Sequence, residues 1–552
     1  MKLNGLVLLL WAVCAFDMWG GAAARQPLGH DVAGAKRVTS CGTIIGTPGL
    51  YEVKKDLNAS DAGTCITITA SGVTLGLAAN ITGVHAGVGI SIREAGVVVR
   101  GSGTDHGTVP NVSVFSIGVQ DESGGNVIGD FTANGNDNGI IFEGPVTTRT
   151  IADNMTANGN AKDGIRILSP VGIRGVILSA NDNGGRGYYL APGSNGSVLA
   201  NFSAKDNGSV GVDIESSSNT FRGCTVSGGT NGLVVVKGAT GNAIVDCDDD
   251  GAPASNNEAF DKNGSCDQNA WYANGFTGKH KPACTNAVKI GQPVSKCGTI
   301  SSSGAYFLSK DIVAKDTDCL SITAKDVILN LNGHGLKGDD GVGTGLRITS
   351  SASNFRMLSA EDNDIHLFTI GIEADADDAT LEGLDVTGNA DTGIFVNGAR
   401  NLTIGAFGSS VNRHLGVHLV NASGVLAHNF GSNSNDTYGV FIQHSNDNVF
   451  SNFTVGNGGA NGIAGLYIGC SLTGPDPSCA DVPSSGNVVA HAAGALNTKY
   501  GWAIDVGSKQ NVMSDLNGSG NGVFDMYEGN STCRNDWIFD VPGTSNAPAC
   551  LQ

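Results

Sequence analysis

The chain has 552 residues, of which 82 are glycine and only 15% are charged. Soluble proteins usually contain about a quarter charged residues, and the many glycines favour short strands and tight turns over helices. The formal net charge of −19 argues against nucleic acid as a partner, because phosphate contacts need a basic surface. It also disfavours a polyanionic glycan unless cations bridge the two.

The first residues have the pattern of a secretory signal peptide. Lys2 provides the positive start, residues 6–16 form an apolar core, and three alanines at 22–24 provide the cleavage site. This apolar run is too short to span a bilayer, and the sequence contains no other membrane-length apolar stretch. We expect a signal peptide over 1–24, a leader over 25–40 and a secreted protein at the cell exterior, cell surface or periplasm.

A glycine followed by an apolar residue, any residue and usually a second apolar residue recurs along the rest of the chain. Most repeats are 21 to 26 residues apart, and a regular period of this length predicts a solenoid with one such strand in each coil. Residues two and four after the glycine should point outward and form rows along the solenoid. These ladder glycines are Gly89, Gly118, Gly139, Gly164, Gly187, Gly211 and Gly232, then Gly345, Gly371, Gly393, Gly416, Gly439, Gly465 and Gly501.

The second half of the chain echoes the first. CGTIIGTPGLYEVKKDL at Cys41 corresponds to CGTISSSGAYFLSKDI at Cys297, and CITITASGVTLGL at Cys65 corresponds to CLSITAKDVILNL at Cys319, an offset of 319 − 65 = 254. We therefore expect a tandem duplication with units over 41–285 and 297–552, each with a disulfide-bearing C-terminal cap, joined by a linker over 286–296.

Turns rich in Asn and Gly separate the strands, as in SVLANFSAKDNG and NVFSNFTVGNG, and both residues tolerate the left-handed backbone of sharp corners. The combined pattern resembles the right-handed parallel β-helix repeat family, which is related in fold to pectate lyases. The resemblance covers nearly all of the mature chain. It implies an all-β protein made of two consecutive right-handed parallel β-helices, with a polysaccharide as the partner of the ladder-strand face.

Thirteen cysteines leave twelve after removal of the signal peptide, and an even number in an exported chain predicts disulfides. Free buried thiols are the alternative. Cys41 and Cys65 of the first unit correspond to Cys297 and Cys319 of the second, and Cys266 and Cys284 correspond to Cys533 and Cys550. Cys224 with Cys247, and Cys470 with Cys479, complete a plausible set of pairs.

The outward rows of the first half bring unlike functional groups to neighbouring coils. Arg166, Tyr189 and Asp213 occupy the second position after the glycine, and Glu215 the fourth. Two carboxylates on one strand face suit acid and base roles in glycoside cleavage, and Arg166 suits bidentate binding of a uronate. We predict these four as catalytic residues, with Ca²⁺ binding by the carboxylates or a merely solvated sheet face as alternatives.

The same row in the second half is aromatic. Phe395, Phe441 and Tyr467 flank His418 on neighbouring coils, and exposed aromatic rings suit the CH faces of sugars. We predict these four as substrate-binding residues, unless a turn or loop covers the rings. Because Arg166 aligns with His418 and Asp213 with Tyr467, we expect that the halves do not share their chemistry.

No complete catalytic signature is present. Gly333-His334-Gly335 matches one polygalacturonase element, but the accompanying Asn-Thr-Asp, Asp-Asp and Arg-Ile-Lys elements are absent. We predict a protein that binds or processes an extracellular polysaccharide as a lyase or hydrolase, or alternatively a non-catalytic cell-surface or adhesive structural protein. No cofactor is certain and Ca²⁺ is the candidate ion. Glycosylation sequons occur at Asn58, Asn80, Asn111, Asn154, Asn201, Asn401, Asn421 and Asn452.

Overall fold

The computed structural model describes residues 34–102, 109–144, 149–252, 254–265, 268–286, 291–315, 317–339, 341–359, 363–475, 483–531, 534–538 and 540–546. Within these ranges the chain is an all-β solenoid of parallel strands, as the sequence predicted, with one 3₁₀ turn, η2 (Ala283–Asn286). No described helix is long and apolar enough to cross a membrane. The predicted signal peptide and leader residues 25–33 lie outside the described residues.

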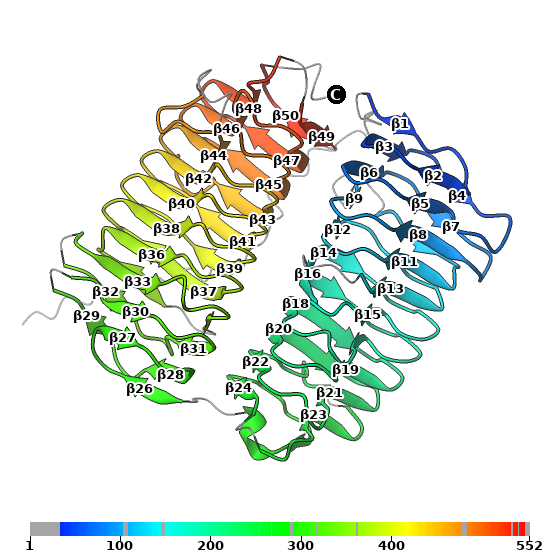
Figure 1. The fold of residues 1–552 in the computed structure, drawn as a ribbon, viewed down its shortest axis with the longest axis horizontal. Coiled ribbons are helices and arrows are strands. Elements are labelled where there is room, and N and C mark those ends of the chain that lie inside the picture. Colours follow the sequence, from blue (N-terminus) through cyan, green and yellow to red (C-terminus); the bar gives the residue numbers. More distant parts are fainter. Residues whose placement is uncertain are drawn as a thin grey trace, which may run out of the picture.

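The strands form two stacks, which Figure 1 shows side by side. In the first stack, a ladder sheet carries the glycine motifs and a contact sheet faces the second stack. The first ladder sheet contains β2 (Thr43–Ile45), β5 (Ile66–Ile68), β8 (Val88–Ile92), β11 (Ile117–Asp121), β13 (Asn138–Phe142), β15 (Ile165–Ile167), β17 (Tyr188–Leu190), β19 (Val210–Ile214), β21 (Asn231–Val235), β23 (Asn257–Asp261) and β25 (His280–Lys281). The first contact sheet contains β1 (Lys36–Arg37), β3 (Gly49–Val53), β6 (Val73–Leu77), β9 (Val98–Gly101), β12 (Val127–Gly129), β14 (Thr150–Thr156), β16 (Ile173–Ser179), β18 (Val198–Lys205), β20 (Thr220–Ser227), β22 (Ala243–Val245) and β24 (Ala270–Tyr272). A short third sheet contains β4 (Leu57–Asn58), β7 (Ile81–Thr82) and β10 (Val112–Ser113).

The second stack repeats this arrangement. Its ladder sheet contains β27 (Gly298–Ile300), β30 (Leu320–Ile322), β33 (Thr344–Ile348), β36 (Ile370–Ala374), β38 (Thr392–Asn397), β40 (Leu415–Val420), β42 (Tyr438–Gln443), β44 (Ala464–Ile468), β46 (Tyr500–Ile504) and β48 (Phe524–Glu528). Its contact sheet contains β26 (Gln292–Val294), β28 (Gly304–Leu308), β31 (Val327–Asn330), β34 (Arg356–Leu358), β37 (Thr380–Thr387), β39 (Thr403–Gly408), β41 (Leu426–Ser432), β43 (Val449–Val455), β45 (Val488–Ala495), β47 (Val512–Ser519) and β49 (Asp536–Ile538), with β29 (Ile312–Val313), β32 (Leu336–Lys337), β35 (Asp364–His366) and β50 (Val541–Pro542) at its margin.

Two predicted boundaries differ from the structure. Lys36 and Arg37, expected in the leader, form β1 and pair with Tyr51 and Glu52 of β3. Likewise β26, expected in the linker, pairs with β28. Both short strands add a row to the end of a contact sheet, which covers backbone groups of the next strand that water would otherwise meet.

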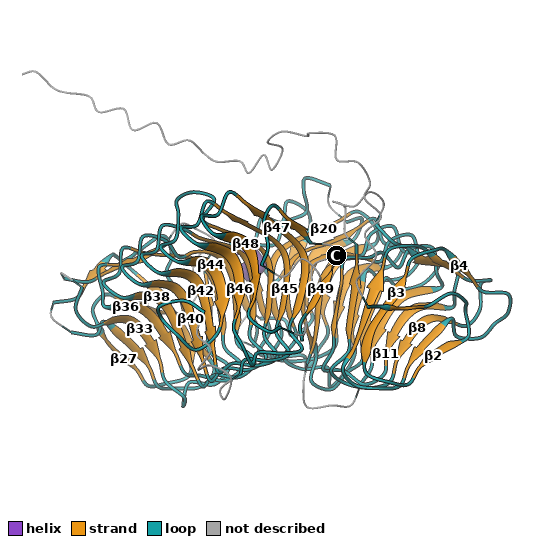
Figure 2. Ribbon diagram, turned by 90° about the horizontal axis from the view of Figure 1, so that it is seen from above, coloured by secondary structure: helices purple, strands orange, loops and turns teal. Residues whose placement is uncertain are grey.

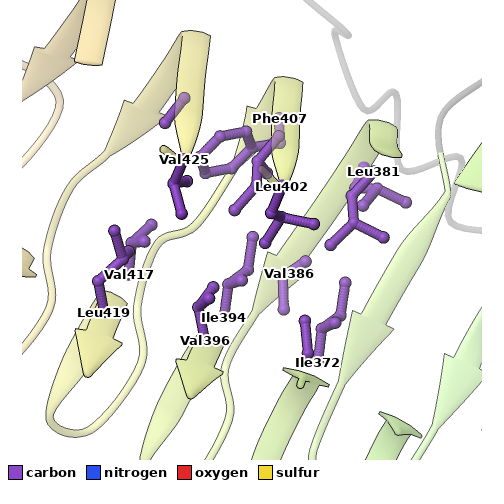
Figure 3. Close-up of a cluster of buried hydrophobic side chains, with 14 of the residues drawn as sticks. Ile372, Leu381, Val386, Ile394, Val396, Leu402, Phe407, Val417, Leu419 and Val425 are labelled. Carbon is purple, nitrogen blue, oxygen red and sulfur yellow. The ribbon is translucent and has the colours of Figure 1, made fainter. Parts of the chain in front are cut away.

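The alternation predicted for the ladder strands is present. Ile165 and Ile167 of β15 point into the core and are fully buried, whereas Arg166 between them is partly exposed. Figure 3 shows the same inward rows in the second stack, where Ile394, Val396, Val417 and Leu419 belong to one core with contact-sheet side chains such as Phe407 of β39. Each coil therefore contributes a thin slice to one continuous apolar core.

A ladder of buried asparagines explains the glycine that opens ten of the fourteen motifs. The backbone N–H of Asn160 donates to Oδ1 of Asn183 (3.0 Å), and that of Asn183 donates to Oδ1 of Asn207 (3.0 Å). A Cβ on Gly164 would lie 2.7 Å from Nδ2 of Asn183 and 2.8 Å from the Ala157 carbonyl oxygen. The second stack has the equivalent ladder at Asn389, Asn412, Asn435, Asn461 and Asn497.

Three disulfides join neighbouring coils: Cys41–Cys65, Cys224–Cys247 and Cys297–Cys319. Cys284 and Cys470 are also disulfide-bonded, whereas Cys266, Cys479, Cys533 and Cys550 lie outside the described residues. These bonds fit an oxidising compartment, as expected of an exported protein.

The stacks run in opposite directions and touch through their contact sheets. The order of the cross-stack contacts shows this, because Arg222 of β20 meets Glu382 of β37 (3.0 Å) while Asp130, after β12, meets His491 of β45. Seen from above, β45 and β47 lie near the middle of the molecule and β2 and β27 toward its opposite ends (Figure 2). The apolar part of this interface contains Ile151, Val176, Ala200, Leu426, Val449, Val488, Val512 and Ile538.

Buried charges are concentrated at this interface. Arg100 is fully buried between Asp130 and Asp153, and His491 bridges Asp130 and Asp515, with 2.7 Å from Nδ1 to the Asp515 carboxylate. Burial opposes the charged imidazole, but the two carboxylates raise the pKa of His491 to about 10. Asn154, a predicted sequon asparagine, also contacts His491, at 3.1 Å.

A second buried group joins the stacks near their other ends. Glu382 accepts hydrogen bonds from Arg222 (3.0 Å) and His428 (3.0 Å). Burial would raise the pKa of Glu382, but its interactions with His428 and Arg222 lower it below its usual value. Two further arginines donate to backbone carbonyl oxygens of the opposite stack. Arg174 donates to those of Asn401 and Gly424, and Arg356 donates to those of Gly241 and Ser218.

We predict that Gly164→Ala destabilises the protein by about 1–3 kcal/mol, because the new methyl group overlaps the asparagine ladder. Denaturant unfolding measures the loss. Gly298→Ala is the matched control, since a Cβ there meets nothing within 4 Å. Equal effects of the two substitutions would contradict the steric explanation.

We predict that the stabilisation from His491 depends on pH. The pKa of His491 is about 10 in the folded protein and 6.5 in the unfolded chain. Its contribution to the free energy of unfolding is therefore complete below pH 6.5 and is lost as the pH rises through 10. Melting temperatures of the wild type and His491→Gln should therefore converge over this range. His414→Gln, at a side chain that is 66% exposed, should show no such convergence, and a constant gap for His491→Gln would refute the prediction.

Candidate functional site

The structure brings the four predicted catalytic residues together on the first ladder sheet. Arg166 of β15 lies beside Tyr189 of β17, and Tyr189 lies beside Asp213 of β19 in the strand register. Glu215 directly follows β19. Figure 1 shows β15 and β19 on the outer flank of the first stack, away from the second stack.

Tyr189 is the centre of this group. Its hydroxyl donates a hydrogen bond to Oε2 of Glu215 (3.1 Å). The guanidinium carbon of Arg186 lies 4.0 Å from the centre of its ring, and that of Arg166 lies 5.9 Å away. Arg186 also pairs with Asp213, with 3.2 Å from Nε to Oδ2. The ring is therefore held between cations on one side and a carboxylate at its hydroxyl.

Arg186 and Asp163 are site residues that the sequence analysis missed. Each directly precedes a ladder glycine, and that position was not part of the outward rows considered. Asp163 lies 3.7 Å from Nε of Arg166 and 3.8 Å from Nη1 of Arg186, and it accepts the backbone N–H of Arg186 (2.9 Å). On these two coils the residue before the glycine therefore also points outward, and Asp163 and Arg186 lie next to each other.

An open depression of about 530 Å³ adjoins the group. Three cationic side chains, Lys162, Arg166 and Arg186, and a single carboxylate, Asp163, line it, so its lining has a net charge of 3 − 1 = +2. This is opposite in sign to the whole chain. Carboxylates outside this lining pair with two of its cations, Asp137 with Lys162 and Asp213 with Arg186, so the excess of positive charge is confined to the lining itself. The remaining lining residues are Asn138, Ala161, Gly184, Gly185 and Ser209.

The surroundings shift the proton affinities of two members of the group. Burial raises the pKa of Tyr189, and the neighbouring Glu215 raises it further, so the phenol keeps its proton at neutral pH. Burial also raises the pKa of Asp213, while Arg186 opposes that shift and Glu215 adds to it. Both shifts extend the pH range over which the group keeps its proton.

The predicted Ca²⁺ site receives no support from the geometry. Asp213 is paired with Arg186, and Glu215 accepts a hydrogen bond from Tyr189. Among the described residues, no group of three or more His, Cys, Asp or Glu side chains is arranged to hold a metal ion.

The aromatic row of the second half is stacked as predicted, but half of it is covered. His418 lies 4.9 Å from Phe441 and 5.3 Å from Phe395, and Phe441 lies 5.3 Å from Tyr467, between ring centres. Phe441 and Tyr467 are fully buried, so the exposure expected of these two rings is wrong. Phe395 and His418 remain partly exposed.

The physical reason is the segment of residues 469–475, which follows β44 and covers the two rings. The Tyr438 hydroxyl donates to the Ser471 carbonyl oxygen (3.1 Å), and the Tyr467 hydroxyl donates to that of Gly474 (3.1 Å). These bonds hold the segment over the two rings. Residue burial in a solenoid therefore depends on which loop crosses a coil as well as on strand alternation.

We predict opposite shifts in the pKa of Tyr189 from two substitutions. Glu215→Gln should lower it by removing a neighbouring negative charge, and Arg186→Met should raise it by removing a positive one. Titration of ¹³C-tyrosine by NMR measures both, and Tyr189→Phe identifies the resonance. Shifts of the same sign would show that the contacts described above do not govern this phenol.

No protein-family model and no curated protein matches the chain. Among solved structures, the chain is similar to a variant of the periplasmic alginate epimerase AlgG, with 12% identity over 73% of this chain and 77% of that chain and a TM-score of 0.23. It is also similar to the A-module of the Azotobacter vinelandii mannuronan C-5 epimerase AlgE6, with 11% identity, 93% and 92% coverage and a TM-score of 0.20. A variant of the PL6 family alginate lyase AlyGC matches with 11% identity, 92% and 96% coverage and a TM-score of 0.16. Likeness at this level carries no argument about the reaction of this chain.

Proposed function

We propose that the protein is exported and that it binds and cleaves a carboxylate-bearing polysaccharide on the first ladder sheet. The observation that carries the proposal is the Tyr189–Glu215 hydrogen bond beside two arginines. It places a proton donor and a carboxylate next to groups that bind an anion. A sheet face whose charges served only solubility would not require this combination.

Arg166 and Arg186 are the groups for binding a sugar carboxylate. A guanidinium binds a carboxylate through two parallel hydrogen bonds, and both side chains border the depression. Neutralising that carboxylate also acidifies the proton on the adjacent sugar carbon, because the negative charge that develops there is stabilised. Asp163, which contacts both arginines, positions them.

Tyr189, Glu215 and Asp213 supply the proton transfers. In an elimination, Glu215 takes the proton from the carbon next to the sugar carboxylate, a C=C bond forms, the C–O bond to the leaving sugar breaks, and Tyr189 protonates the leaving oxygen. In a hydrolysis, Asp213 protonates the leaving oxygen and Glu215 activates water or attacks the sugar. The raised pKa of Asp213 moves this carboxyl toward the donor role in hydrolysis, and Tyr189 carries a phenolic proton to transfer in elimination.

We predict cleavage of at least one of pectate, alginate and glycosaminoglycan, with neutral glycans as uncleaved comparators. New ultraviolet-absorbing unsaturated ends identify elimination, and reducing ends alone identify hydrolysis. Tyr189→Phe should lower kcat by about 10²–10⁴-fold if the phenol transfers a proton, whereas Arg186→Ala should both raise KM and lower kcat, because the guanidinium binds the sugar carboxylate and stabilises the charge that develops beside it.

The control is Arg93→Ala, which removes an exposed arginine of the same ladder face that pairs with Glu122 at 3.3 Å. It should leave both constants unchanged. Binding without cleavage, lost in Arg186→Ala, would leave only the binding part of the proposal. The absence of both binding and cleavage would favour a non-catalytic surface protein.

A further inference from the structure

A second depression, of about 480 Å³, lies on the opposite flank of the molecule, on the second ladder sheet. Its residues come from β36, β38 and β40, the turns that precede β38, β40 and β42, and the segment after β44. We propose that it is a binding site for an uncharged sugar ring of a polysaccharide, distinct from the site on the first stack. Its lining residues are Ile370, Asp391, Thr392, Phe395, His414, Leu415, His418, Thr437 and Leu472.

The first argument is the open end of the aromatic row. Phe395 and His418 lie on adjacent strands in register, with ring centres 5.3 Å apart, and both line the depression. His418 is stacked at 9° on the buried Phe441, which fixes its orientation. Fixed rings at the edge of an apolar hollow suit the CH faces of a sugar, because the ring binds without losing much side-chain freedom.

The second argument is the wall opposite these rings. Leu472 is 56% exposed and borders the depression, and the hydrogen bonds of Tyr438 and Tyr467 hold its segment in place. The hollow is therefore bounded by aromatic rings, by a leucine on the covering segment and by the buried Leu415. The segment that buries Phe441 and Tyr467 also builds one side of the site.

The third argument is the low charge of this lining, in which the one carboxylate has a hydrogen-bonding partner. Asp391 and His414 pair with each other at 2.5 Å, and burial lowers the pKa of His418 to about 4, so that its ring is neutral at pH 7. Lys and Arg do not occur in the lining, whereas three cations line the depression on the first stack. An uncharged ring leaves the Asp391–His414 pair intact, and Thr437 and that pair offer hydrogen-bonding groups to sugar hydroxyls.

The test is binding of the full chain to soluble galactomannan, arabinoxylan and β-glucan, measured by affinity electrophoresis and calorimetry, with polygalacturonate and alginate as charged comparators. We expect at least one uncharged polymer to bind. Phe395→Ala should weaken that binding about tenfold, the loss of one aromatic contact, and Phe395→Tyr should retain it. Leu472→Asp should weaken it too, and its exposed position makes a folding defect unexpected.

Two controls separate this site from the rest of the molecule. Val411→Ala removes an apolar side chain that is 61% exposed and does not line the depression, and Arg186→Ala alters only the first stack; both should bind uncharged polymers as the wild type does. Failure of every uncharged polymer to bind, or wild-type binding by Leu472→Asp and by folded Phe395→Ala, would overturn the inference. Loss of the cleavage proposed for the first stack would leave it standing.

Discussion

A contact between a ladder glycine and an asparagine side chain of the next coil, found at ten of the fourteen ladder glycines, governs the geometry of this protein. The asparagine side chain satisfies backbone groups that a sharp coil corner leaves inside the core, where an unpaired polar group is costly. It occupies the space that a Cβ at the glycine would need. Because the contact recurs in coil after coil, successive strands start at the same level and equivalent side chains form rows. The outward rows that carry both candidate sites exist only through this register.

The contact sheets decide which faces are free. Burying Arg100, Arg222 and His491 at the interface of the stacks has a large desolvation cost, which their carboxylate partners offset. Such charges add specificity because a shifted alignment would leave them unpaired. The antiparallel alignment therefore follows from matched charges as well as from the apolar residues between them. It leaves both ladder sheets outward, on opposite flanks (Figure 1).

The two flanks share a scaffold but differ in chemistry. On the first, cations surround a phenol and two carboxylates, an arrangement that we propose binds an anionic sugar. On the second, aromatic rings and leucines border the hydrogen-bonded Asp391–His414 pair, an arrangement that we propose binds an uncharged ring. A repeat whose register is maintained by Asn and Gly can change its outward residues freely, since those residues take no part in the core.

The sequence by itself determined the solenoid, the inward and outward rows and the clustering of Arg166, Tyr189, Asp213 and Glu215, because strand alternation and coil period act locally and repeat. Three of the disulfide pairs indicated by the spacing are present for the same reason, since each joins neighbouring coils. Only the tertiary structure decided the burial of Phe441 and Tyr467, because a segment that follows β44 crosses their coils. It also decided the roles of Arg186 and Asp163 and the buried charges between the stacks. The contacts of Arg186 and Asp163 depend on the direction of single side chains. The buried charges join residues more than a hundred positions apart. Neither kind of contact produces a repeating pattern in the sequence.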